Sequence, residues 1–354
     1  MKVLKYPLTV IIFVILFFAA QRLFVPKYAE SAYEGGLIRE YYDEETYDHD
    51  VLFIGDCEIY ENISPVTLWE EYGITSFIRG SAQQTIWQSY YLLEDALRYE
   101  KPDAVVFNVL AMQYAETQRE EYTRLTLDGM RLSESKMKAV EASLTEGESS
   151  LSYLFPLLRF HDRWNELSLE DLKYYFTKPP VSFNGFMVRC DVMPVNIEDL
   201  PTGMKLPDYR FGENAYKYLD EMTKICKDNN IELILIKAPI LYPEWYPEWD
   251  AQMASYAEEN HLRYYNFINN LDDIGLDFTQ DTYDGGLHLN VYGAEKFTSY
   301  LGEILRRENA LPDRRGEAET ARRWAVKSAA YEEMKAAQLK DIQETGKVET
   351  FLIN

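Results

Sequence analysis

Short apolar runs alternate with amphipathic stretches in two parts of the chain. In the first part, the runs VLFIG (51–55), ITSFI (74–78) and DAVVFNV (103–109) are separated by helical spacing near 65–72 and 85–98. In the second part, helical spacing at 213–227, 250–260 and 291–306 flanks the runs IELILIKAP (231–239) and LRYYNF (262–267). Because the runs are continuously apolar, they predict strands buried on both faces, as in a parallel sheet covered by helices. We predict an α/β fold, specifically a three-layer α/β/α sandwich with a mostly parallel sheet.

The region between these two parts, residues 112–210, lacks the alternation. Charged helical stretches such as SESKMKAVEASL are followed by the Pro-rich segment KPPVSFNGF. Such a region is typical of an insertion that covers a sheet edge or an active-site mouth. We therefore divide the α/β domain into residues 26–111 and 211–308, separated by an insertion or cap at 112–210. Residues 309–354 are rich in Ala, Glu, Lys and Arg, which predicts a helical C-terminal tail.

The N-terminal segment is apolar enough to predict insertion into a membrane. Two lysines precede an uncharged run from Tyr6 to Gln21, and further apolar residues extend it to about the 20 residues that cross a bilayer. We predict an uncleaved transmembrane signal anchor at 6–25, and a cleaved signal peptide is the alternative. Positive charge before the span places residues 1–5 in the cytoplasm. The predicted location is the cell membrane, single-pass, with the catalytic domain extracytoplasmic.

Composition and charge narrow the classes of partner. The chain has 354 residues, 47% of them hydrophobic, which is enough for a large core. Its 59 acidic residues outnumber its 36 basic ones, giving a formal net charge of -23 that repels phosphate backbones, so nucleic acid is excluded as a partner. Three cysteines cannot form a dense disulfide framework. The sequence contains no CxxC pair and no HExxH motif, so we predict no metal site and no cofactor.

Four short motifs together resemble the SGNH/GDSL hydrolase family. FIGDCE, after a predicted strand, resembles the first block, G-D-S-L, and places Cys57 where the family has its nucleophilic serine. FIRGSAQQT resembles the second block, with Gly80 at its glycine, and PDAVVFNV resembles the strand of the third block, with Asn108 at the oxyanion asparagine. DGGLHLNVYGAEKF resembles the last block and places His288 at the catalytic base. The resemblance covers about 51–305 outside the insertion, and implies the SGNH hydrolase fold with a flavodoxin-like sheet.

The acid of the last block departs from the family pattern. In the family the acid lies three residues before the histidine, but that place is Gly285 here, and Asp284 lies four residues before His288. The resemblance implies that Asp284 orients the imidazole, provided that the altered turn lets it reach.

The resemblance implies a complete acyl-transfer site. Cys57 would attack an acyl carbonyl, and His288 would take the thiol proton and later protonate the leaving alkoxide. Asp284 would fix the imidazole tautomer. Backbone N–H groups at Cys57 and Gly80, together with the Asn108 amide, would bind the oxyanion.

Two alternatives remain open at the nucleophile. Cysteine is among the residues most often buried, so Cys57 is also consistent with an inert thiol at a strand end. Glu58 stands where the family has leucine, and a carboxylate beside a thiol raises the thiol pKa. Asp56 is expected to accept hydrogen bonds from backbone N–H groups of the loop.

The segment LYPEWYPEWD, residues 241–250, follows a predicted strand and therefore lies on the predicted catalytic rim. Tyr242 and Trp245 are equally suited to stacking on sugar rings and to packing the cap onto the sheet. Lys237 either binds an anionic substrate group or pairs with an acidic neighbour. The predicted substrate-binding residues are Asp56, Lys237, Tyr242 and Trp245.

Membrane-anchored members of the family that the motifs resemble commonly remove or transfer acyl groups on cell-surface polymers. The resemblance therefore implies an acyl ester hydrolase or O-acyltransferase that acts on a cell-surface polysaccharide or a teichoic-type acyl ester. One alternative is a catalytically degenerate SGNH domain that binds an envelope polymer or a partner protein. Another is an anchored interaction protein whose tail helix docks a membrane-protein partner.

Overall fold

A five-stranded parallel sheet forms the centre of the protein. The computed structural model describes residues 5–25, 35–173, 181–200, 203–309 and 311–352. The strands are β1 (Val51–Gly55), β2 (Ser76–Gly80), β3 (Ala104–Asn108), β4 (Glu232–Lys237) and β5 (Arg263–Asn266). They are hydrogen-bonded in the order β2-β1-β3-β4-β5, every pair parallel, which is the flavodoxin-like order of doubly wound folds. The predicted α/β fold with a parallel sheet is confirmed.

The register brings the carboxyl ends of the central strands to one edge. Gly55 at the end of β1 pairs with Gly80 at the end of β2, and Asn108 at the end of β3 pairs with Ile236 near the end of β4. The residues that follow these strands therefore emerge side by side, at the edge where doubly wound sheets bind ligands.

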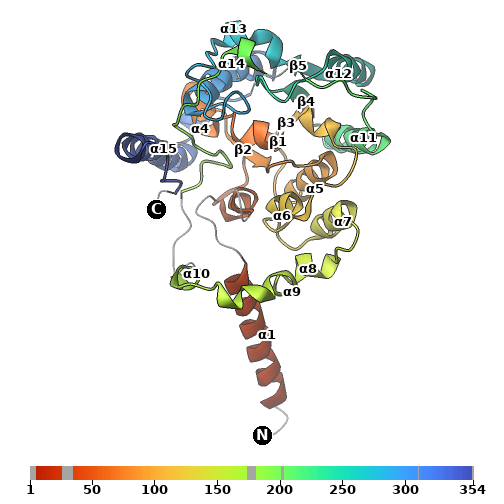
Figure 1. Ribbon diagram of the computed structural model, residues 1–354, viewed down its shortest axis with the longest axis vertical. Helices are drawn as coiled ribbons and strands as arrows, with labels where there is room; N and C mark the ends of the chain where they lie inside the picture. The colour runs from red at the N-terminus through yellow and green to blue at the C-terminus, as the bar shows by residue number, and fades with distance from the viewer. Residues whose placement is uncertain (1–4, 26–34, 174–180, 201–202, 310, 353–354) are drawn as a thin grey trace.

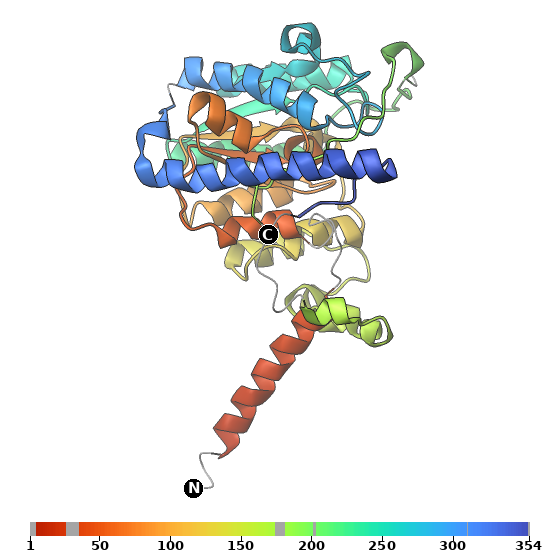
Figure 2. The same cartoon turned by 90° about the vertical axis from the view of Figure 1, so that its left-hand side faces the viewer.

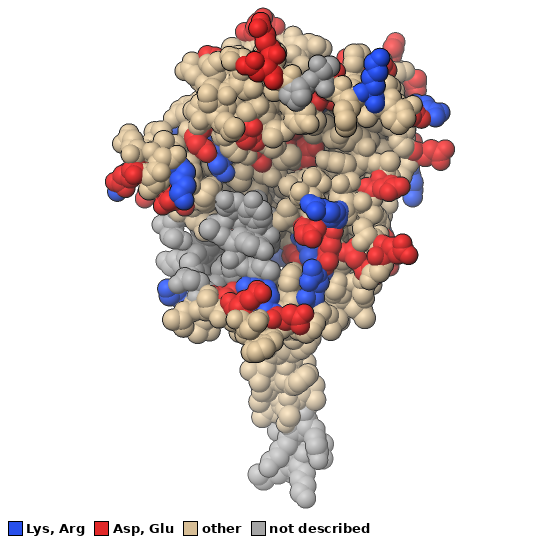
Figure 3. Space-filling model, viewed as in Figure 1, with Lys and Arg blue, Asp and Glu red and all other residues tan. Residues whose placement is uncertain are grey.

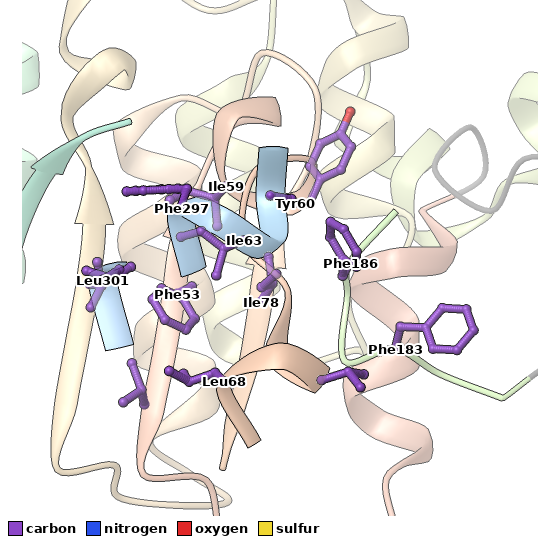
Figure 4. Close-up of a cluster of buried hydrophobic side chains, with 14 of the residues drawn as sticks. Phe53, Ile59, Tyr60, Ile63, Leu68, Ile78, Phe183, Phe186, Phe297 and Leu301 are labelled. Atoms are coloured by element: carbon purple, nitrogen blue, oxygen red, sulfur yellow. The ribbon is translucent and has the colours of Figure 1, made fainter. Parts of the chain in front are cut away.

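Helices cover both faces of the sheet (Figure 1). One face packs on α4 (Pro65–Tyr72) and α14 (Val291–Asn309), with α15 (Ala318–Thr345) packed against α4, and the other on α5 (Ile86–Ala96), α11 (Glu213–Asp228) and α12 (Pro247–Asn260). Alternation along the strands sends Phe53 to the first face and Leu52 to the second. Figure 4 shows the first face, where Phe53 and Ile78 of the sheet lie near Phe297 and Leu301 of α14. The three predicted layers are present.

Local sequence signals set the ends of the helices nearest to the site. Ser64 caps α4 by accepting a hydrogen bond from the backbone N–H of Thr67, with Pro65 in the first turn. At the start of α5, the Gln88 side chain accepts the backbone N–H of Thr85 at 3.0 Å. The shorter elements are α2 (Gly36–Glu40), η2 (Tyr41–Asp43), α3 (Cys57–Tyr60), η6 (Phe267–Asn270), α13 (Leu271–Ile274) and η7 (Arg314–Gly316).

The region predicted as an insertion is mostly short helices. They are η3 (Val109–Gln113), α6 (Glu120–Leu127), α7 (Glu134–Ser143), α8 (Ser150–Leu154), α9 (Leu157–Phe160), η4 (His161–Asn165), α10 (Leu169–Lys173) and η5 (Ile197–Asp199). Between α10 and η5, the Asn184 carbonyl accepts the Ile78 N–H at 2.9 Å, and the Asn184 amide donates to the Ser76 carbonyl at 2.7 Å. This stretch therefore occupies the outer edge of β2, which would otherwise present unpaired backbone groups.

The N-terminal helix α1 (Lys5–Phe24) projects away from the α/β body (Figure 2). Large apolar side chains along it, from Leu8 to Phe18, are exposed. Within the part of the chain that the structure describes, no helix meets both the length and the apolarity needed to cross a membrane. Residues 1–4 of the predicted cytoplasmic tail lie outside the described residues, and the signal anchor stays a prediction.

Candidate active site

Cys57 lies where β1 turns sharply into the short helix α3. Gly55 permits the turn, because a Cβ atom there would stand 2.8 Å from the Ile59 side chain and 3.0 Å from that of Asn108. Asp56 caps α3, and its carboxylate accepts a hydrogen bond from the Glu58 backbone N–H at 3.2 Å. The predicted role of Asp56 as acceptor for a loop N–H is thus observed, and the cap presents Cys57 as the first residue of the helix.

Cys57 and His288 lie close enough that each shifts the pKa of the other, so two residues far apart in the sequence meet at one site. Cys57 is only partly exposed, and burial raises the pKa of its thiol to about 11, although His288 pulls that pKa down. Burial alone would lower the pKa of His288. The charges of Cys57 and Glu61 and the hydrogen bond with Asp284 outweigh it and hold that pKa well above its usual value.

Asp284 reaches His288 despite the altered spacing. One of its oxygens lies 2.6 Å from Nδ1 of His288, and the other accepts the His288 backbone N–H at 2.8 Å. The intervening Gly285 and Gly286 have φ of 76° and 96°, which few other residues adopt. Thr282 closes the turn, because its hydroxyl accepts from the Gly286 N–H and donates to the His288 carbonyl. With Nδ1 bound to the acid, Nε2 is the ring nitrogen left for the thiol.

A second carboxylate, which sequence reasoning missed, also faces the imidazole. Glu61 is buried, and its Oε2 lies 3.3 Å from Nδ1 of His288. The Tyr283 hydroxyl donates to Glu61, and the Tyr283 ring stacks on the imidazole with centroids 6.1 Å apart. Burial raises the pKa of Glu61. The sequence spacing could have indicated Glu61, because it follows Cys57 by one helical turn and therefore lies on the same side of the chain.

The Glu61, Asp284 and His288 ligand atoms lie within 4.8 Å of one another, a spacing that could hold a metal ion. These atoms are already joined by the hydrogen bond between Asp284 and His288 and by the ion-pair contact between Glu61 and His288, both of which orient the imidazole. We therefore interpret the group as the support of a catalytic base.

Beneath the nucleophile lies a buried polar network. Lys237 donates to both oxygens of Glu58, at 2.8 and 2.9 Å, and neither side chain is more than 1% exposed. The Asn108 amide donates to Glu58 at 2.9 Å and to Asp56 at 3.1 Å, while its oxygen accepts the Ala238 N–H. Burial and the charge of Glu58 raise the pKa of Asp56 to about 7.

This network corrects two predicted roles. Lys237 is not placed to bind substrate, because it is fully buried and pairs with an acidic neighbour, which was the alternative reading. Asn108 lies at the predicted strand end, but both N–H groups of its amide are directed at carboxylates rather than at an oxyanion. It holds Asp56 and Glu58 together under Cys57.

Gly80 lies beside the nucleophile loop. A Cβ atom on Gly80 would come within 3.1 Å of the Gly55 carbonyl and 3.3 Å of the Asp56 carbonyl, so a larger residue would push the two strand ends apart. Tyr114, which no motif indicated, lies close enough that burial, Asp56 and Cys57 raise the pKa of its phenol. Oxyanion binding by the Gly80 N–H stays a prediction.

The aromatic rim mainly packs the insertion onto the body. Trp245 is 8% exposed and lies against Phe211 and Trp249, with ring centroids 6.0 and 5.4 Å away. The neighbouring Glu244 accepts the backbone N–H of Gly203 at 2.6 Å. Trp245 is therefore not available to stack on a sugar, and that predicted role is corrected.

Tyr242 remains exposed on the rim, with 40% of its surface accessible. Its backbone N–H and that of Leu241 both donate to the Gly286 carbonyl, which connects the rim to the loop that carries His288. Of the predicted substrate-binding side chains, Tyr242 is the one that solvent, and hence a ligand, can reach.

The fold and site define a doubly wound α/β protein with a cysteine, a histidine and an aspartate gathered at the carboxyl edge of its sheet. No family model matches the sequence, and no curated protein matches it. One similar solved structure is a protein from Desulfitobacterium hafniense DCB-2 described as lipolytic and of the G-D-S-L family. It has 14% identity and a TM-score of 0.37, with 73% of this chain and 100% of that chain covered.

Another similar structure is a GDSL-like lipase from Bacteroides thetaiotaomicron VPI-5482, with 11% identity and a TM-score of 0.33 over 73% of this chain and 87% of that one. Because these identities and TM-scores are low, neither structure supports an assignment of function. The function proposed below therefore rests on the geometry of the site itself.

Proposed function

We propose that the protein is an acyl ester hydrolase or O-acyltransferase that uses Cys57 as its nucleophile, as the SGNH/GDSL-like motifs imply. The observation that carries the proposal is that Asp284 lies 2.6 Å from Nδ1 of His288, and that His288 lies near enough to Cys57 to lower the pKa of its thiol. Asp284 reaches His288 although it lies one residue out of the family spacing, which supports a site of the nucleophile, base and acid type.

In the first half of the reaction, the Cys57 sulfur bonds to the acyl carbon while its proton passes to Nε2 of His288. Collapse of the tetrahedral intermediate breaks the bond to the leaving oxygen, which takes the proton from His288. In the second half, a water molecule or an acceptor hydroxyl gives its proton to His288 and attacks the thioester. The released Cys57 thiolate recovers that proton, which restores the site.

The negative oxygen of each intermediate needs hydrogen-bond donors. We assign them to the backbone N–H groups of Cys57 and Gly80, since the Asn108 amide is occupied. One such donor typically contributes about 2.7–4 kcal/mol to lowering the barrier. Asp284 and Glu61 stabilise the imidazolium that forms in each half-reaction.

We further propose a cell-surface polysaccharide ester as substrate, with the enzyme held at the cell membrane by α1. The exposed ring of Tyr242 supports a sugar ligand, because aromatic faces stack on sugar rings. The net charge of -23 favours a neutral glycan over a phosphate-rich teichoic-type polymer. Acidic side chains are spread over the face of the body in Figure 3, whereas the described part of α1 shows none.

One observation favours a second candidate, a domain that binds an envelope polymer or a partner protein without chemistry. Burial raises the pKa of Cys57 to about 11, so the resting thiol is mostly protonated near neutral pH. Such a thiol acts as a nucleophile only if His288 removes its proton during attack.

Hydrolysis of a small activated acyl ester separates the two candidates. Cys57→Ala should reduce turnover to the uncatalysed background, a loss of roughly 10⁴-fold or more. Cys190→Ala is the matched control, because Cys190 is buried elsewhere and should leave turnover intact. Turnover that is absent from the wild type, or that survives in Cys57→Ala, would contradict a cysteine hydrolase.

A further inference from the structure

Four short helices of the insertion lie at the end of α1 that joins the body. We call α8, α9, η4 and α10 together the collar. α9, η4 and α10 contact α1 directly, and Figures 1 and 2 show the collar gathered at this junction. Phe17 of α1 lies 5.9 Å from the Phe155 ring, and Arg163 donates to the Phe24 carbonyl at 2.6 Å. The collar is therefore attached to the helix as well as to the body.

The collar exposes large apolar side chains to an unusual degree. Five of them are between 50% and 74% exposed, namely Leu151, Leu158, Trp164, Leu169 and Leu172. The adjoining α1 exposes every residue from Val10 to Leu16, each between 44% and 67%. Because the collar contacts α1, the two together form a large apolar surface, of the kind that marks an interaction site.

The distribution of exposure on α1 indicates what covers this surface. Successive residues of a helix point about 100° apart, so seven consecutive exposed apolar residues leave no polar face. A partner protein or a second copy would cover one face and leave the opposite one in water. Lipid acyl chains surround a helix on all sides, and the junction between such a helix and a polar body is where tryptophan is enriched at membrane interfaces.

We propose that the collar lies in the interfacial layer of a lipid bilayer, with Trp164 and the four leucines in contact with acyl chains. The polar residues between them, including Asp162 and Arg163, face the headgroups and the body. Binding of this kind is driven by apolar burial rather than by charge, which suits a chain with a net charge of -23. The proposal rests on the proposed embedding of α1, and it fixes the height of the catalytic domain above the membrane.

Tryptophan fluorescence measures directly whether the collar is in contact with lipid or with water. Of the six tryptophans, Trp164 is 72% exposed, whereas the other five, Trp69, Trp87, Trp245, Trp249 and Trp324, are at most 8% exposed. The full chain in phosphatidylcholine vesicles should lose Trp164 emission to a lipid carrying a shallow nitroxide, and Trp164→Phe should remove that quenching. Quenching of Trp164 by aqueous iodide instead would overturn the proposal, as would protection from both quenchers, which would indicate a protein partner.

A paired variant tests whether apolar contact holds the collar. Leu158→Asp with Leu169→Asp should bring the lipid quenching down to the level of Trp164→Phe. Val326→Asp, at an exposed apolar position on α15, should leave the lipid quenching unchanged.

Carbonate extraction tests the embedding of α1 separately. Protein that stays in the membrane fraction while Trp164 is open to iodide would refute the collar alone, and protein that is extracted would refute the embedding on which the collar rests.

Discussion

His288→Ala should lower kcat/KM for ester hydrolysis by about 10²–10⁴-fold. The buried thiol of Cys57 has a pKa raised to about 11, so it is mostly protonated at neutral pH and needs the imidazole to remove its proton during attack. Steady-state rates across pH 6–10, with circular dichroism to verify folding, measure the effect. His261→Ala is the matched control, because His261 ends α12 and no role is assigned to it. A variant that retains wild-type rates near neutral pH would remove His288 from the mechanism.

Glu61, the second carboxylate beside His288, allows the role of His288 to be tested by the pH dependence of activity. The base must be neutral to accept a proton, so activity should rise with pH through the raised pKa of His288. Glu61→Gln removes one of the charges that raise this pKa, so the rising limb should move to lower pH. Asp284→Asn should move it in the same direction and also lower kcat, because it disturbs the ring orientation. An unchanged profile in Glu61→Gln would mean that Glu61 does not act on His288.

Lys237→Met should destabilise the protein by about 3–5 kcal/mol, since it leaves Glu58 as an unpaired buried charge. Glu58→Gln combined with Lys237→Met removes both charges and should recover much of the loss. Arg322→Ala breaks the exposed pair with Glu319, and should cost about 0–1 kcal/mol. Urea denaturation gives all three values. A Lys237→Met loss as small as that of Arg322→Ala would contradict the buried network.

Asp56 adds a pH dependence to this stability. Its folded pKa of about 7 lies above its ordinary value of 3.8, so the folded state holds the proton more tightly than the unfolded state. Its contribution to stability is therefore complete below about pH 4 and is lost as pH rises towards 7. Removing the Lys237 charge should enlarge this effect, so Lys237→Met should be less destabilised at pH 5 than at pH 8.

Much of the fold was predictable because the strands are apolar at successive positions and alternate with amphipathic helices. The strand predicted at 74–78 is observed at Ser76–Gly80, shifted by the buried Arg79. A charged residue interrupts the apolar pattern, but this one donates to the Tyr42 hydroxyl and lies over the Tyr41 ring. The pattern of the strand alone does not reveal partners that lie this far away in the sequence.

The positions of Cys57 and His288 at the sheet edge were predictable for a similar reason, because each follows the local pattern of its own motif. The pairing of Glu58 with Lys237 was not, since the two are 179 positions apart and each suggests a different role when read alone. From the sequence alone, Glu58 was expected to raise the pKa of the Cys57 thiol, and Lys237 was a candidate substrate ligand. The orienting role of Asp284 depended on two glycines with positive φ, a property of the folded loop.

Peptide mass spectrometry tests the nucleophile most directly. The protein is mixed with an activated acetyl ester, quenched in acid within seconds and digested, so that any thioester is located on its peptide. The account predicts acetyl mass on the peptide that contains Cys57, lost in Cys57→Ala and weakened in His288→Ala. Turnover of the ester with no acyl mass on that peptide, or the same mass in Cys57→Ala, would contradict it.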